Sequence, residues 1–131
     1  MCILSIVLLP IAVLFLGDCF FGDYSKQFQS YYTNTQILLL VIISPIFEEI
    51  VFRGLIQDFL VKKIKCKYLA FTSVNLLFVL LHIHKNMGII YLMFVFICGM
   101  IFSVVKYKSS RVLYPIVLHS YYNLLFILKY W

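Results

Sequence analysis

The stretch PIFEEIVFRG, residues 45–54, places two adjacent carboxylates and a guanidinium inside a segment that otherwise has the composition of a membrane span. Each charged side chain at the centre of a membrane helix costs about 2.5–3.5 kcal/mol on insertion scales, so such groups must be paired and must face protein or water. Glu49 and Arg53 are four residues apart and share one helical face. Glu48 points about 100° away from Glu49 and needs a different partner. The cluster predicts either a polar contact that holds helices together or a catalytic site.

The composition of the whole chain is typical of a polytopic membrane protein. Hydrophobic residues make up 64% of the 131 residues, against about 45–50% in ordinary soluble domains, and the mean hydropathy is +1.03. Five apolar segments occur, at residues 2–16, 36–60, 67–83, 87–105 and 111–128. Because lipid cannot satisfy exposed backbone groups, we expect an all-α fold, a polytopic transmembrane helical bundle of about five helices, as a single membrane domain over residues 1–131.

The positive charge indicates topology. The net charge is +6, but most Lys and Arg residues lie in short loops beside apolar segments, which gives no support for a nucleic-acid partner. Residues 62–67 carry four lysines and residues 106–111 carry three basic residues. The positive-inside rule puts both loops and the N-terminus in the cytoplasm, in a multi-pass protein of the cell membrane surrounded by lipid. No Lys or Arg precedes Lys26, so residues 2–16 are interpreted as a short first helix and not as a secretory signal.

Polar side chains also interrupt two later apolar segments. Asn75 and His82 are seven residues apart, and His119 and Asn123 are four apart, so each pair shares a helical face. A single histidine in an apolar helix is more often structural than catalytic, but polar faces on three helices favour a shared site. At about 1.5 Å of rise per residue, the depths from the predicted cytoplasmic side are roughly 20 Å for Glu48, 22 Å for His82, 12 Å for His119 and 18 Å for Asn123. These depths are compatible with one level in the membrane.

The chemistry that this set supports is hydrolysis. A carboxylate beside a histidine can hold a water molecule and remove its proton. Glu48, His82 and His119 could instead bind a divalent metal such as Zn²⁺ that activates the water. His119 and Asn123 offer donors for a developing oxyanion, a role worth about 3–4 kcal/mol. The sequence has no Gly-x-Ser-x-Gly, His-Glu-x-x-His or Cys-x-x-Cys, so serine-type, thermolysin-like and zinc-ribbon schemes have no support. Three further polar residues are interpreted as interfacial or packing groups: Asp58, Asn75 and His84.

Three motifs lie in order on separate apolar segments: Glu48-Glu49-x-x-x-Arg53, Phe78-x-x-x-His82 and His119-x-x-x-Asn123. Together they resemble the signature of the CAAX protease and bacteriocin-processing family of intramembrane endopeptidases, with a family-like catalytic core over about residues 40–128. Phe96-x-x-Gly99 resembles the small-residue helix motif of that family. Ser103 stands where the family commonly has a second glycine, so the resemblance implies looser helix packing there.

The resemblance implies a role for each motif residue. Glu48 would activate the attacking water with help from His82. Glu49 would orient the site and hold Arg53, and Phe78 would support the site from its own motif.

The same resemblance implies that His119 and Asn123 stabilise the oxyanion. It leaves open whether a bound metal or a glutamate-polarised water carries out the hydrolysis. The implied substrate is a membrane-associated peptide or a lipidated protein: eukaryotic members trim prenylated CAAX proteins, and bacterial ones resemble peptide-maturation and bacteriocin self-immunity proteins. Only one helix is predicted before the glutamates. A substrate-gating region would therefore be missing or supplied by a partner protein or an oligomer.

Two other classes of function stay open. A non-catalytic membrane immunity or scaffold protein would keep the fold and bind its partner without cutting it, which agrees with the small size of the chain. An ion or proton pathway would also use intramembrane carboxylates and histidines. Transporters usually show paired broken helices or repeats, and the sequence contains no evident repeat.

Overall fold

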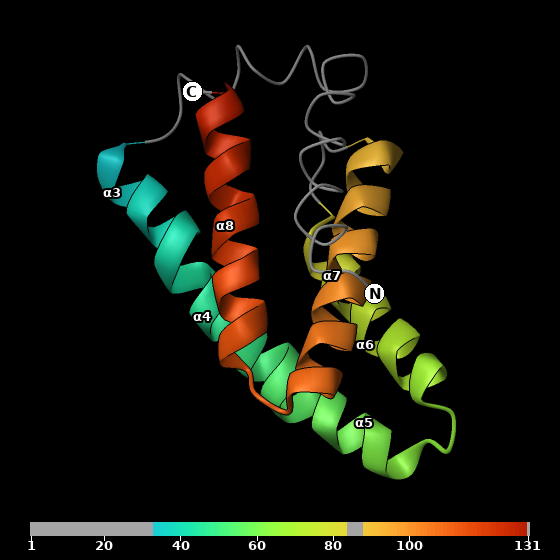
Figure 1. The fold of residues 1–131 in the computed structure, drawn as a ribbon. Helices are drawn as coiled ribbons and strands as arrows, with labels where there is room; N and C mark the ends of the chain where they lie inside the picture. Colours follow the sequence, from blue (N-terminus) through green and yellow to red (C-terminus); the bar gives the residue numbers. More distant parts are fainter. Residues whose placement is uncertain (1–32, 84–87, 131) are drawn as a thin grey trace. The chain divides into compact units, whose positions relative to one another are not determined.

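The computed structural model describes residues 33–83 and 88–130, and the regular elements in these ranges are all helices (Figure 1). The described residues begin with a continuous helical run, Asn34–Lys63, in which α-helical and π-helical parts alternate. These parts are α3 (Asn34–Leu38), η1 (Leu39–Ile43), α4 (Ser44–Glu49), η2 (Ile50–Gln57) and α5 (Asp58–Lys63), where η marks a π-helix. Three further helices follow: α6 (Lys67–Leu81), α7 (Ile89–Ser109) and α8 (Leu113–Tyr130).

The predicted all-α fold class is confirmed, because four of the five predicted apolar segments form helices whose ends lie within a few residues of those expected. The fifth, residues 2–16, lies outside the described residues. Two of the described helices, Asn34–Lys63 and Ile89–Ser109, are long and apolar enough to cross a membrane. Helix α6 and the apolar part of α8 are shorter. The multi-pass arrangement with a cytoplasmic N-terminus stays a prediction.

Local sequence signals fix several helix ends. Thr33 caps α3: its hydroxyl oxygen accepts the Gln36 N–H, and the Gln36 side chain accepts the Thr33 N–H, which forms a capping box. Lys62 and Lys63 lie in the last turn of α5, where positive charge is favourable beside the helix C-terminus. Ser110 adopts a left-handed conformation with φ of 57° and ends α7.

The described residues form two compact units. One combines residues 33–45 with residues 118–130 and contains α3, η1 and most of α8. The other, residues 46–117, contains most of α4 together with η2, α5, α6 and α7.

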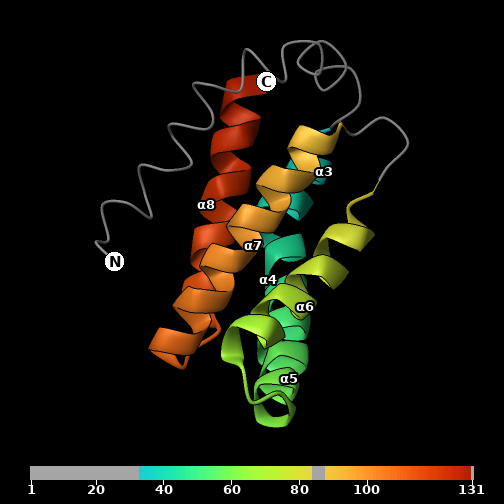
Figure 2. The same cartoon turned by 90° about the vertical axis from the view of Figure 1, so that its right-hand side faces the viewer.

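In the unit of residues 46–117, α6 packs against both α7 and η2 (Figure 2). The apolar core of this packing contains Phe52, Val74, Phe78 and Val95. The rings of Phe52 and Phe78 meet edge to face, with centroids 5.0 Å apart. This arrangement brings the buried face of η2 against the middle of α6, and the polar residues on those faces therefore meet inside the unit.

Candidate active site

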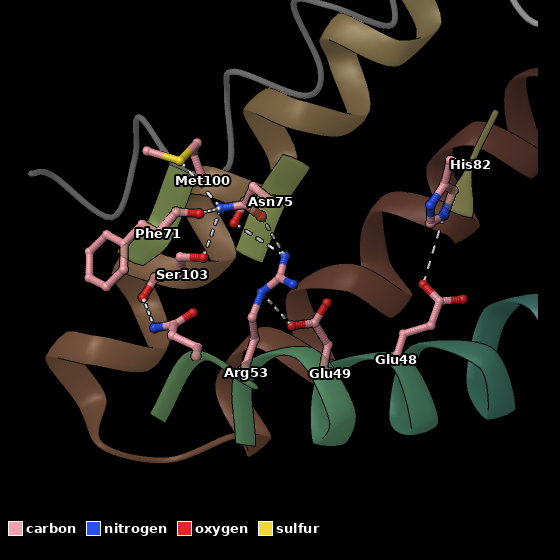
Figure 3. Close-up of polar contacts among 10 residues, drawn as sticks. Glu48, Glu49, Arg53, Phe71, Asn75, His82, Met100 and Ser103 are labelled. Atoms are coloured by element: carbon pink, nitrogen blue, oxygen red, sulfur yellow. Dashed lines mark hydrogen bonds and ion pairs between the residues drawn. The ribbon is translucent and has the colours of Figure 1, made fainter. Parts of the chain in front are cut away.

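Glu48 and His82 form a partly exposed acid and imidazole pair. The Glu48 Oε2 atom lies 3.9 Å from His82 Nε2, and the two side chains are 26% and 23% exposed (Figure 3). His82 Nδ1 lies 2.8 Å from the Phe78 carbonyl oxygen. Because a carbonyl oxygen only accepts, Nδ1 carries a hydrogen and donates it, so Nε2 is the ring nitrogen that faces the carboxylate. The Phe78 ring packs against the imidazole with centroids 4.4 Å apart.

Glu49 and Arg53 form the buried ion pair that their spacing predicts. The Arg53 Nε atom lies 3.2 Å from Glu49 Oε2, and both side chains are fully buried. Figure 3 shows Glu49 and Arg53 extending from their helix toward Asn75, while the neighbouring Glu48 extends toward His82. The two adjacent acids thus serve different partners, as the 100° rotation per residue requires.

Arg53 is the centre of a buried polar network that joins three helices. Its Nη2 atom donates to Asn75 Oδ1 at 3.1 Å and to the Gly99 carbonyl at 3.2 Å. Asn75 Nδ2 donates to Ser103 Oγ at 3.0 Å, and Gln57 Nε2 donates to the Ser103 carbonyl at 3.0 Å. We call these five residues the Arg53 network. Its four polar side chains are buried, which gives the charged guanidinium a protein environment in place of lipid.

The structure corrects two expectations about this network. Ser103 is fully buried between hydrogen-bonding partners, so the looser packing that the missing glycine implied is not observed. Asn75, interpreted as a packing group, bonds directly to Arg53. Two sequence signals could have found the network: Gln57 lies four residues after Arg53, and Asn75 lies two turns before His82 on the same face.

Asp58, also interpreted as a packing or interfacial group, forms an ion pair with Lys106. The Asp58 carboxylate lies 2.7 Å from Lys106 Nζ, and the lysine side chain is only 9% exposed. This pair joins the start of α5 to the last turn of α7.

Asn123, in the other unit, donates from Nδ2 to the Leu40 carbonyl at 2.9 Å. The π-helical register explains why this carbonyl needs a partner. The Ser44 N–H donates to the Leu39 carbonyl, five residues earlier, and the same register would pair the Pro45 nitrogen with Leu40. Proline has no N–H, so the Leu40 carbonyl is freed. With α-helical spacing the proline would instead free the carbonyl of Val41, one residue later.

His119 is buried on α8, one turn before Asn123. Both residues belong to the unit of residues 33–45 and 118–130. That they line one site with Glu48 and His82 stays a prediction.

Among the described residues, no three His, Cys, Asp or Glu side chains are grouped so as to hold a metal ion. Glu48 and His82 provide two donors in the unit of residues 46–117, whereas catalytic zinc sites use three protein ligands. The third expected donor, His119, lies in the other unit, so a metal held by Glu48, His82 and His119 stays a prediction.

Comparison with protein-family models gives a match to the type II CAAX prenyl endopeptidase Rce1-like family over residues 31–125. The chain belongs to this family. The match covers most of the chain and contains all three motifs, so the resemblance stated from the sequence is confirmed. The Rce1-like family consists of membrane-embedded endopeptidases, and this agrees with the two long apolar helices. Searches of curated proteins and of solved structures give no match for this Rce1-like chain.

Proposed function

We propose that this Rce1-like protein hydrolyses a peptide bond of a membrane-associated peptide or lipidated protein with a water molecule activated by Glu48 and His82. The observation that carries the proposal is the 3.9 Å separation of Glu48 Oε2 and His82 Nε2. This separation is too long for a strong direct hydrogen bond. One water would bridge the two atoms after a small movement of the Glu48 side chain, because its Oε2 atom is buried in the structure.

A water placed at about 2.8 Å from both atoms would see them at an angle of about 90°. This angle is near that between the two hydrogens of water, so one water could donate to the Glu48 carboxylate and to the neutral His82 Nε2 at once. The water oxygen would then present a lone pair to a substrate carbonyl. The partial exposure of both side chains leaves room for a substrate to approach.

The reaction that this geometry supports is general-base hydrolysis. The water oxygen would attack the scissile carbonyl carbon while Glu48 takes the proton, giving a tetrahedral intermediate. Collapse of the intermediate would break the C–N bond, and the protonated Glu48 would pass its proton to the leaving amine. His82 would orient the water, and the buried ion pair of Glu49 and Arg53 would hold the helix that carries Glu48.

His119 and Asn123 are proposed to stabilise the oxyanion of the intermediate. The Asn123 amide has two hydrogens, and its bond to Leu40 uses one of them. The second hydrogen would serve the oxyanion.

Apolar side chains beside the pair support a lipid-associated substrate. Phe47 precedes Glu48 in the chain, Leu81 precedes His82 and Ile83 follows it, and all three are strongly exposed. In a membrane these side chains contact lipid, and a peptide with a lipid anchor would meet Glu48 and His82 from that apolar surface. A place in bacteriocin maturation or self-immunity belongs to the same proposal. We also propose that the protein crosses the membrane several times and that its two basic loops lie in the cytoplasm.

The test is cleavage of a farnesylated fluorogenic peptide ending in a CAAX sequence by the purified protein in detergent. Glu48→Gln and His82→Ala should each lower the rate by about 10²- to 10⁴-fold, the usual contribution of a positioned acid or base. Leu69→Ala is the matched control for His82→Ala, because Leu69 is an exposed side chain of the same helix that lies away from that apolar surface. If both site variants cleave as fast as the parent at equal abundance, catalysis by this pair is excluded. A parent that protects cells, with protection retained by Glu48→Gln, would favour the non-catalytic immunity or scaffold function.

A further inference from the structure

We infer that Asn75, which belongs to none of the three motifs, is a positioning residue that sets the separation of Glu48 and His82 by holding Arg53. The inference rests on the proposed function for its catalytic consequence. Its structural part, a guanidinium held by the Asn75 amide, stands on the contacts alone.

The orientation of the Asn75 amide is fixed by its neighbours. Nδ2 lies 2.8 Å from the Phe71 carbonyl oxygen, which only accepts, so the nitrogen must lie on that side. Nδ2 also lies 3.0 Å from Ser103 Oγ. The Oδ1 atom consequently faces Arg53, whose guanidinium only donates. An amide satisfies both sides at once, whereas a carboxylate offers acceptors only and an aliphatic side chain offers neither.

Arg53 is held by groups from three helical segments. Glu49 lies on its own helical run, Asn75 lies on α6 and Gly99 lies on α7. Glu49 binds Nε, while Asn75 and the Gly99 carbonyl bind Nη2. A Cβ atom at Gly99 would overlap Asn75 Oδ1 and would lie 3.2 Å from Arg53 Nη2. The close approach of α7 therefore depends on the absence of a side chain at this position. The Phe78 ring covers the guanidinium, with its centroid 4.9 Å from Arg53 Cζ.

The contact between Arg53 and Asn75 joins the same two helical segments as the contact between Glu48 and His82. Along the first segment the two contact residues are five positions apart, and along α6 they are seven apart, or about 10.5 Å. The order is reversed between the segments, as in an antiparallel pair. A slide or rotation of α6 that lengthened the Arg53 to Asn75 bond would also move His82 relative to Glu48. The buried bond thus fixes the register in which the exposed pair stands 3.9 Å apart.

Asn75→Leu and Asn75→Asp are the direct tests, and Ser103→Ala is a milder one because it removes only the hydroxyl that receives Nδ2. Ser73→Ala is the matched control for Ser103→Ala, since the Ser73 hydroxyl only bonds to the Leu69 carbonyl of its own helix.

The first readout does not depend on catalysis. The sequence contains two arginines, Arg53 and Arg111, so ¹⁵N-arginine labelling gives two guanidinium groups to observe by NMR in detergent micelles. In the parent protein we expect separate, slowly exchanging Nη signals for Arg53 and averaged signals for the exposed Arg111. Asn75→Leu should merge the Arg53 Nη signals, and Ser103→Ala should broaden them. Unchanged Arg53 signals in a folded Asn75 variant would overturn the inference.

The second readout is kinetic, with the farnesylated CAAX peptide as the probe. A positioning role predicts that Asn75→Asp and Ser103→Ala lower kcat by about 10- to 100-fold with little change in KM, because the reacting groups are displaced while the substrate still binds. Ser73→Ala should match the parent. Equal kcat values for the parent and Ser103→Ala, in protein that retains the fold, would refute the kinetic part. If the parent does not cleave the probe, the proposed function fails, and the NMR result still decides whether Asn75 holds Arg53. Should Asn75→Leu not fold, Ser103→Ala decides both readouts.

Discussion

Gly99→Ala should destabilise the protein although alanine is the better helix former. The added Cβ would overlap Asn75 Oδ1 and would lie 3.1 Å from Asn75 Cγ. Asn75 would have to move away from Arg53, because the Cβ is fixed to the backbone of α7 and cannot rotate aside. The 3.1 Å bond between the amide and the guanidinium would then be lost.

The size of the effect follows from two opposing terms. A hydrogen bond to a charged group contributes about 1.5–3 kcal/mol, and replacing glycine by alanine inside a helix returns about 0.8–1.0 kcal/mol. We expect Gly99→Ala to lower the free energy of unfolding by about 0.5–2 kcal/mol. Gly54→Ala is the matched control, because its Cβ would meet Val112 Cγ2 at an ordinary 3.4 Å. The control should be neutral or up to about 1 kcal/mol stabilising, which leaves about 0.5–3 kcal/mol between the two variants.

The assay is unfolding in mixed micelles with increasing SDS, followed by circular dichroism. A third variant, Asn75→Ala, separates the steric cause from others: in that background Gly99→Ala should cost much less, since the overlapping amide is gone. Equal stability of the Gly99→Ala and Gly54→Ala proteins would refute the reasoning, and so would a Gly99→Ala cost that is unchanged when Asn75 is alanine.

Two further predictions concern other polar contacts. Asn123→Ala should lower the free energy of unfolding by about 1–3 kcal/mol, because the Leu40 carbonyl loses its donor. The same substitution should cost little in a Pro45→Ala background, where an N–H returns, and an additive double-mutant cycle would contradict this. Asp58→Asn should cost more than Lys106→Met, since the first leaves a buried ammonium without its carboxylate and the second removes the buried charge. Asp58→Asn should lower the free energy of unfolding by about 1 kcal/mol or less, because the carboxylate is 46% exposed. If SDS unfolding shows Lys106→Met to be less stable than Asp58→Asn, this explanation is refuted.

The sequence predicted the helices and the ion pair of Glu49 and Arg53 because both depend on short-range periodicity. Apolar runs of sufficient length must be helical in lipid, and residues four apart share a face. The separate direction of Glu48 followed from the same period, and the structure puts His82 in that direction. These features need no knowledge of which helices pack together.

The same periodicity puts Gln57 on the helical face of Arg53 and Asn75 on that of His82, but it could not predict that Gln57 and Asn75 join Arg53 in one network. Whether Asn75 faces lipid or a guanidinium depends on how α6 meets η2, and the Gly99 carbonyl is available only because α7 approaches closely. The hydrogen-bond partner of Asn123, the Leu40 carbonyl, could not be predicted either. It depends on a π-helical register that moves the freed carbonyl by one residue, and apolar periodicity does not report such a shift.

The order in which the partners of Arg53 are synthesised has a consequence for biogenesis. Glu49 lies on the same helix, so this ion pair can form as soon as the segment leaves the ribosome, whereas Asn75 and Gly99 are translated later. Until they arrive, the nascent segment carries charges that each cost about 2.5–3.5 kcal/mol at the bilayer centre. We therefore expect the segment to stay beside the translocon or at the lipid headgroups and to enter the bilayer together with the two later helices.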